Sequence, residues 1–207
     1  MPVAPDRPTD EPLPVYVLVG GGSQRFGSAK ATHPVDGQPW ALHVATRLSS
    51  DTPRVAMVGN AALPELCDVR FVPDHPRYQG PLTGALAAIE DRLEQYGPGR
   101  LVLASCDLVR PEPRWLTPLC VAHDEQLLDV AAYRIDGLWQ PFPSVVHTRW
   151  RAQLSQLLAG GRRSFQAVLD ESETQSVSWE SAPASGPPQA NTPEALRALF
   201  SENDRGD

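Results

Sequence analysis

A glycine-rich segment that ends in the chain's single lysine is the first feature that could do chemistry. The sequence holds 17 arginines but only one lysine, Lys30, and the run Gly20–Gly22 precedes it in the segment 18–30. An ammonium is a small, movable point charge suited to triphosphate oxygens, whereas a guanidinium is a planar fork. Glycines let backbone N–H groups approach phosphate oxygens closely. The segment therefore predicts a phosphate-binding loop, to which Arg25 and Lys30 add positive charge.

This loop matches neither of the two best-known phosphate motifs. The P-loop needs a glycine directly before its lysine, but Ser28 and Ala29 separate Gly27 from Lys30. The dinucleotide fingerprint needs a third glycine where Arg25 stands. The alternative is a tight strand-to-helix turn without a ligand, although such turns seldom need three glycines and two cations.

Two aspartates follow apolar runs and are candidates for holding a metal ion. Asp107 comes after the run 101–104, and Asp74 comes after Phe71 and Val72. Magnesium is commonly held by one or two carboxylates together with the phosphates of a substrate. Asp107 is the stronger candidate, with Asp74 as its partner. The alternative for each is a turn, where aspartate is common.

Further downstream, residues 80–84 can place a helix N-terminus against a ligand. The alternative is a helix start that simply packs on the sheet. The side chains of Gln140, Asn191, Arg162 and Arg163 could orient a second substrate, although each alone is a weak signal.

The elements that must position these residues alternate along the first 120 residues. Buried strands are predicted at 15–19, 55–58, 69–72 and 101–104, and helices at 40–48 and 81–96. This alternation predicts a doubly wound α/β sheet with right-handed crossovers. Such sheets bind ligands in the crevice at the carboxyl ends of their strands, where the glycine segment and Asp107 both fall.

The second half of the chain is less regular. Strands are predicted at 130–134 and 141–147, around a turn at Asp136 and Gly137. Helices are predicted at 150–158 and 164–169, and a last helix from Thr192, Pro193 and Glu194. Residues 1–14 are rich in proline and acidic side chains and are expected to be a disordered leader. We therefore expect a single domain over 15–200 and an acidic tail at 201–207.

Composition argues against some classes of binding partner and indicates a cellular compartment. The net charge of −7 argues against nucleic acids and anionic membranes as main partners. The three cysteines are odd in number and lack a Cys-x-x-Cys spacing, which suits a reducing cytosol. The sequence shows neither a long apolar stretch nor a signal-peptide pattern. We expect a cytoplasmic protein.

Taken together, these segments resemble the molybdenum cofactor guanylyltransferase family of nucleotidyltransferases. The family pattern Leu-Ala-Gly-Gly-x-Ser-x-Arg-Met-Gly-x-Asp-Lys is similar to residues 18–30, and 34–39 match the stretch that follows. Residues 80–84, 105–107 and 191–196 also match, in order and at similar intervals. The resemblance covers about residues 15–200, and the five blocks in register are more specific than any one of them.

The resemblance implies a fold, a reaction and a set of partners. The fold would be a Rossmann-like three-layer α/β/α nucleotidyltransferase fold with a mostly parallel central sheet. The reaction would be Mg²⁺-dependent transfer of GMP from GTP to the phosphate of molybdenum-molybdopterin, with release of pyrophosphate. Molybdoenzymes or chaperone proteins would receive the product.

The resemblance also assigns roles to residues. Catalysis would depend on Lys30, Arg25 and Asp107, and Asp107 would bind Mg²⁺. The nucleotide would contact Leu18, Val19, Gly20, Gly21, Gly22, Ser23, Lys30, Asp74, Gly80 and Asp107. The acceptor would contact Gln140, Arg162, Arg163 and Asn191. In this family a glycine at the position of Gly20 goes with GTP, whereas cytidylyl-transferring relatives carry alanine, whose side chain would crowd a purine.

The sequence departs from the family pattern at a few positions and leaves two other readings open. Val19 and Phe26 replace alanine and methionine, and Ala29 replaces the aspartate before the lysine. Thr32 and His33 replace a usual apolar pair, and Gln189 stands where an asparagine is frequent. A sister transferase would use CTP or another phosphorylated acceptor. A non-catalytic nucleotide-binding homologue is the other alternative, with Ala29 as its main support.

Overall fold

The computed structural model describes residues 13–20, 30–49, 54–60, 63, 66, 68–78, 80–126, 128–180 and 186–201. Most of the predicted leader and acidic tail lies outside the described residues. So do Gly21, Gly22, Ser23 and Arg25 of the glycine-rich segment.

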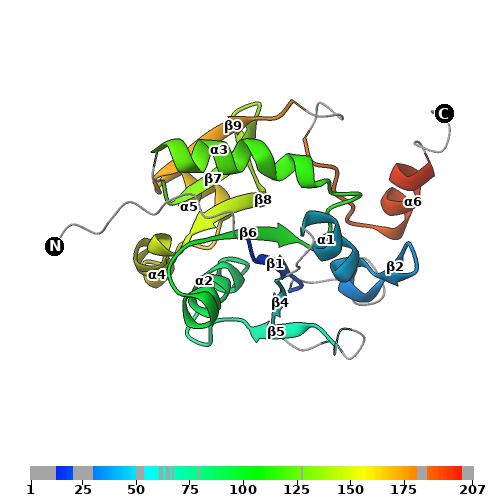
Figure 1. Cartoon of the computed structure of the whole chain (residues 1–207), viewed down its shortest axis with the longest axis horizontal. Helices are drawn as coiled ribbons and strands as arrows, with labels where there is room; N and C mark the ends of the chain where they lie inside the picture. The colour runs from blue at the N-terminus through cyan, green and yellow to red at the C-terminus, as the bar shows by residue number, and fades with distance from the viewer. Residues whose placement is uncertain are drawn as a thin grey trace.

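A seven-stranded sheet forms the middle layer, with strand order β5-β4-β1-β6-β8-β7-β9 (Figure 1). β8 runs antiparallel to both of its neighbours, while every other pair in the sheet is parallel. The predicted mostly parallel α/β fold is thus confirmed. The strands are β1 (Val15–Leu18), β4 (Val55–Gly59), β5 (Arg70–Pro73), β6 (Arg100–Ser105), β7 (Val130–Ile135), β8 (Leu138–His147) and β9 (Thr174–Ser178), and a separate pair is formed by β2 (Pro34–Val35) and β3 (Gln38–Pro39).

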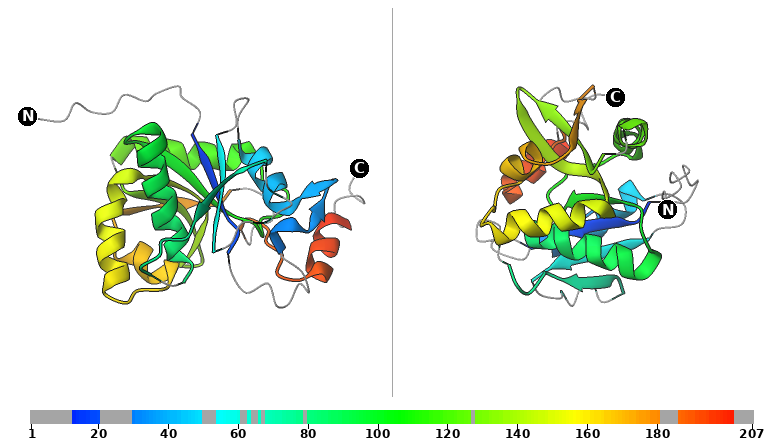
Figure 2. Two further views of the ribbon diagram at one scale, coloured as in Figure 1. Left: turned by 90° about the horizontal axis from the view of Figure 1, so that it is seen from below. Right: turned by 90° about the vertical axis from the view of Figure 1, so that its left-hand side faces the viewer.

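Helices cover both faces of this sheet. The α-helices are α1 (Trp40–Leu48), α2 (Leu82–Tyr96), α3 (Leu116–Gln126), α4 (Arg151–Ala159), α5 (Phe165–Asp170) and α6 (Pro193–Ser201), and short 3-10 helices span Lys30–Thr32, Pro113–Trp115 and Thr148–Trp150. Figure 2 shows α2 and α4 side by side on one face. α1 and α3 lie over the other face. None of the described helices is both long and apolar enough to cross a bilayer.

The apolar run of β1 shows why the strand is buried on both sides. Successive side chains of a strand point to opposite faces. Tyr16 and Leu18 therefore join the core beneath α2 and α4, while Val15 and Val17 join the core beneath α1. A strand covered on both faces reads as a continuous apolar run rather than an alternating one.

The second half contains one accurate turn prediction and two omissions. Asp136 and Gly137 form the hairpin turn between β7 and β8 with φ values of 50° and 79°, which suits an Asp-Gly pair. The sequence analysis did not identify α3 or β9. The β9 sequence, Thr174–Ser178, is polar and only partly buried, and it forms the edge of the sheet beside β7. An edge strand needs no apolar run, so its pairing partner decides its structure.

A buried histidine, His123, stacks on the partly exposed His147 where α3 meets the end of β8. The rings of His123 and His147 stack at a centroid distance of 5.9 Å, and Nε2 of His123 is buried without a hydrogen-bond partner among the described residues. Burial, assisted by the neighbouring His147, lowers the pKa of His123 to about 3. The folded protein thus holds this ring neutral down to a pH at which an unfolded histidine, with a pKa near 6.5, is charged.

We predict that the unfolding free energy falls as pH drops from about 6.5 toward 3, because only the unfolded state takes up this proton in that window. His123→Phe should flatten the profile, so that wild type loses about 2–3 kcal/mol more than the variant between pH 7 and pH 4. Denaturant titrations at a series of pH values measure this. The slopes are compared rather than the absolute stabilities, because the variant also loses a backbone hydrogen bond at Leu128. Parallel profiles would contradict the assignment.

Candidate active site

A cavity of about 810 Å³ opens at the carboxyl ends of β1, β4, β5 and β6. Its wall includes the last residues of these strands or those directly after them, as expected for an open α/β sheet. Many of the residues singled out from the sequence line it: Leu18, Val19, Gly20, Lys30, Asp74, Gly80, Asp107 and Asn191.

Three of the residues predicted to contact an acceptor are not part of this lining. The Gln140 side chain lies beside Gly186, with its Cγ 3.7 Å from where a glycine Cβ would stand. The Arg162 guanidinium pairs with Glu171 at 2.6 Å. Arg163 comes closer, because its Cδ packs 3.4 Å from the Cβ position of Gly80 at the cavity wall. Their role toward an acceptor stays a prediction.

Asp74 directly follows β5, and its carboxylate lies between Gly20 and Gly84. Its backbone N–H donates to the Gly59 carbonyl at 2.8 Å, which ties the loop after β5 to the end of β4. A Cβ on Gly84 would meet Asp74 Oδ1 at 3.2 Å and Leu18 Cδ2 at 3.0 Å. Burial raises the pKa of Asp74, and the nearby Thr83 side chain opposes that shift. This partly desolvated carboxylate can accept hydrogen bonds from the base or ribose of a nucleotide.

The N-terminus of α2 faces the same cavity. Gly80 has a φ of +101°, a conformation that side chains rarely adopt. Its carbonyl accepts bonds from the Thr83 backbone N–H at 3.1 Å and the Thr83 hydroxyl at 2.7 Å. The segment 80–84 therefore both begins a helix on the sheet and lines the cavity. The positive end of the helix dipole favours an anionic ligand here.

Opposite charges meet where β1 and β6 end. Lys30 Nζ lies 3.7 Å from Asp107 Oδ2 and donates a hydrogen bond of 2.8 Å to Asn191 Oδ1. The Ser105 hydroxyl donates to the other oxygen of Asp107. The side chains of Lys30 and Asp107 are only 14% and 20% exposed. The sequence analysis named each of these charged groups, and the structure brings them together.

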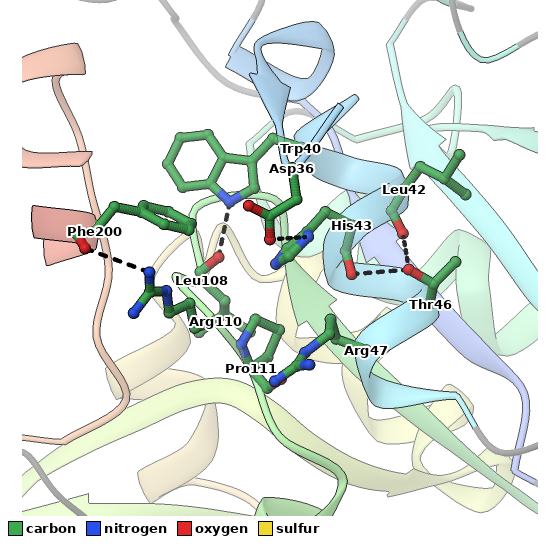
Figure 3. A network of polar contacts seen from close by, with 10 residues as sticks. All are labelled: Asp36, Trp40, Leu42, His43, Thr46, Arg47, Leu108, Arg110, Pro111 and Phe200. Atoms are coloured by element: carbon green, nitrogen blue, oxygen red, sulfur yellow. Dashed lines mark hydrogen bonds and ion pairs between the residues drawn. The ribbon is translucent and has the colours of Figure 1, made fainter. Parts of the chain in front are cut away.

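The loop that carries Asp107 is held from the α1 side (Figure 3). The Trp40 indole N–H, at the start of α1, donates to the Leu108 carbonyl at 2.8 Å. About two turns further along the helix, Arg47 Nε donates to the Pro111 carbonyl at 3.2 Å. Trp40 is fully buried, so the carbonyl it satisfies lies at a fixed place. These bonds fix the position of the backbone next to the Asp107 carboxylate.

The donor set at Asp107 fits Mg²⁺ only in company with a phosphate ligand. Among the residues that the structure describes, no group of three or more histidine, cysteine, aspartate or glutamate side chains could hold a metal ion. One carboxylate with the Ser105 hydroxyl beside it leaves most of a six-oxygen shell to be completed by phosphate and water. That division suits Mg²⁺, which is usually bound through one or two carboxylates and substrate phosphates.

Some lining residues were missed by sequence reasoning. Asn60 directly follows β4, so the rule that identified Asp74 and Asp107 at strand ends could have found it. His75 and Tyr78 follow Asp74 in the loop and stack on each other at 5.1 Å. Phe142 reaches the cavity from the antiparallel strand β8, and no local sequence signal indicates that placement.

Comparisons with known proteins show the family and the fold. A family model described as the MobA-like NTP transferase domain matches residues 15–175. A probable molybdenum cofactor guanylyltransferase from Bacillus anthracis is 27% identical over 172 residues, which is 81% of this chain and 84% of the relative.

Solved structures show the same fold. The molybdopterin-guanine dinucleotide biosynthesis protein A from Archaeoglobus fulgidus superposes with a TM-score of 0.73 at 18% identity, covering 93% of this chain and 100% of that one. A nucleotidyl transferase from Methanothermobacter gives a TM-score of 0.66 at 14% identity, covering 95% and 99%.

Gly84→Ala tests whether the space beside Asp74 belongs to a nucleotide. A methyl group there must displace Leu18 or the Asp74 carboxylate. We therefore expect the binding of a nucleoside triphosphate, measured by calorimetry, to weaken about ten-fold. Alanine is favoured over glycine inside a helix by about 1 kcal/mol, which should offset the local strain and leave the protein folded. Glu94→Ala, on an exposed turn of the same helix, is the matched control. Wild-type affinity in Gly84→Ala would contradict the placement.

Proposed function

Because the chain belongs to the MobA-like NTP transferase family, we propose that it transfers GMP from GTP to the terminal phosphate of molybdenum-molybdopterin. Family membership makes the chain a nucleotidyltransferase, and the proposal concerns which nucleotide and which acceptor it uses. The observation that carries it is the meeting of Lys30, Asp107 and the α2 N-terminus around one cavity. Such a site suits a polyphosphate.

The names of the relatives support this choice of substrates. The Bacillus anthracis relative is named a probable molybdenum cofactor guanylyltransferase, and the match covers most of both chains. The cavity has a volume of about 810 Å³, and its lining includes His75 and Tyr78 as well as Leu18, Asp74 and Gly84.

The reaction needs positioning and charge stabilisation more than it needs a base. An oxygen of the acceptor phosphate would attack the α-phosphorus of GTP in line. The bond from that phosphorus to the bridging oxygen would break, and the β- and γ-phosphates would leave as pyrophosphate. The attacking oxygen is already anionic, so no proton has to be removed. The Lys30 ammonium and the N–H groups at the start of α2 would stabilise the charge that develops.

Asp107 would hold the magnesium ion together with triphosphate oxygens, and the bound ion would neutralise part of the phosphate charge. Lys30 and Asp107, to which we assign the chemistry, both line the cavity. That arrangement favours an enzyme over a non-catalytic nucleotide-binding homologue.

The surroundings of Gly20 do not by themselves require a glycine. A Cβ at this position would lie 3.7 Å from Asp74 Oδ2 and 3.8 Å from Gly59 Cα, both ordinary contact distances. The protein alone thus leaves room for alanine. A large base lying against the backbone at this position would explain the glycine, as the resemblance to GTP-using relatives implies.

The test is to incubate the purified protein with GTP, Mg²⁺ and molybdenum-molybdopterin and to detect the pterin–guanine dinucleotide by mass and pyrophosphate by a coupled assay. We expect product with GTP and at least a hundred-fold less with CTP. Asp107→Asn removes one charge without changing the shape of the side chain, and it should lower the rate at least a hundred-fold. Asp68→Asn, at an exposed position outside the cavity lining, is the matched control.

Each remaining outcome identifies a different error. If product forms with CTP and not with GTP, the nucleotide substrate is CTP. Nucleotide binding without turnover on the pterin or on other phosphorylated acceptors would favour the non-catalytic alternative. Full activity of Asp107→Asn would remove Asp107 from the metal site.

A further inference from the structure

We propose that Asn191 is a positioning residue for Lys30, and that the C-terminal segment 186–201 acts as a brace that fixes Lys30 and the Asp107 loop relative to each other. The inference rests on the proposed function, because it assigns Lys30 to the nucleotide's phosphates. It gives Asn191 a role different from the acceptor contact that the family resemblance implies.

The brace pairs directly with the loop that carries Asp107. The Ala190 backbone N–H donates to the Asp107 carbonyl at 3.0 Å, and the Val109 N–H donates to the Pro188 carbonyl at 2.8 Å. The residues between them form an isolated antiparallel bridge. Asn191 follows this short ladder at once, so its place is set by backbone bonds to the Asp107 loop.

The other end of the brace is anchored as well. The Arg110 guanidinium lies 4.4 Å from the centre of the Phe200 ring and donates to the Phe200 carbonyl at 3.3 Å (Figure 3). Leu196 of α6 is buried in the core that also contains α1. The same loop is therefore held by α1 on one side and by α6 on the other.

The distances around Lys30 show what Asn191 contributes. Nζ is within hydrogen-bond length of the Asn191 amide oxygen, at 2.8 Å, but 3.7 Å from the Asp107 carboxylate. A neutral amide oxygen orients the ammonium without cancelling its charge. It also keeps the ammonium from closing onto the carboxylate oxygen that a metal ion would need. An ammonium has three N–H donors, so fixing one of them orients the others.

A double-mutant cycle on nucleotide binding separates this role from direct contact with the acceptor. Asn191→Ala should raise the Kd for GTP, measured without acceptor, by about ten-fold, the size expected for losing a charge-assisted hydrogen bond. In a Lys30→Ala background the same substitution should change Kd by less than two-fold, because its partner is already gone. An equal effect in both backgrounds would overturn the proposal.

Thr192→Ala is the matched control within the brace. The Thr192 hydroxyl accepts a hydrogen bond from the Ala195 N–H at 3.1 Å and caps α6, whereas the neighbouring Asn191 amide oxygen accepts from Lys30. We expect its Kd for GTP to stay within two-fold of wild type. A loss as large as that of Asn191→Ala would mean that the brace as a whole, rather than the Asn191 amide, is responsible, and would overturn the assignment.

The single lysine allows a test that needs neither nucleotide nor turnover. Protein grown with ¹³C-labelled lysine gives one Cε side-chain signal, that of Lys30. We expect two resolved methylene proton shifts in wild type and in Thr192→Ala, and a single averaged, sharper signal in Asn191→Ala. Identical spectra would overturn the proposal. A protein that forms no dinucleotide yet shows this spectral change would refute the proposed function while leaving the Lys30–Asn191 contact established.

Discussion

The ion pair between Lys30 and Asp107 is the interaction on which the rest of this site depends. Lys30 lies on the segment that follows β1, and Asp107 lies in the loop that follows β6. The two side chains meet because β1 and β6 are adjacent parallel strands. Both groups are mostly shielded from water, so their attraction is stronger than that of an exposed pair. Neither is deeply buried, so each remains able to exchange its partner for a ligand. A lysine and a carboxylate held close together at a cavity mouth suit a substrate that carries both phosphate and metal.

Among the described residues, neutral groups bond to this pair, while Arg47 and Arg110 hold the loop further from it. Trp40 holds the Leu108 carbonyl, and Ala190 donates to the Asp107 carbonyl, so the loop is fixed through its backbone. The amide of Asn191 and the hydroxyl of Ser105 then orient the two charged groups. Hydrogen bonds to neutral groups orient the charged side chains without neutralising their charge. The charges therefore remain available to interact with the ligand.

Much of this arrangement could be predicted from the sequence, because strand ends are visible there. Continuous apolar runs identify buried parallel strands, and Leu18, Asp74 and Asp107 follow from where those runs end. The Gly80–Gly84 segment was likewise visible as a helix start. The contact between Lys30 and Asn191 was not visible, since it joins residues 161 positions apart through a pairing that depends on the finished fold. Phe142 was missed for a related reason, because it belongs to the one strand that runs against the others. The polar edge strand β9 carries no apolar pattern at all.

The most direct test of the central claim is a crystal structure of the protein with GTP and magnesium bound. The account predicts the triphosphate in the cavity at the ends of β1 and β6, with Lys30 Nζ within hydrogen-bond distance of a phosphate oxygen and an Asp107 oxygen coordinated to the metal. A nucleotide bound elsewhere, or a complex in which Lys30 points away from the phosphates, would contradict it.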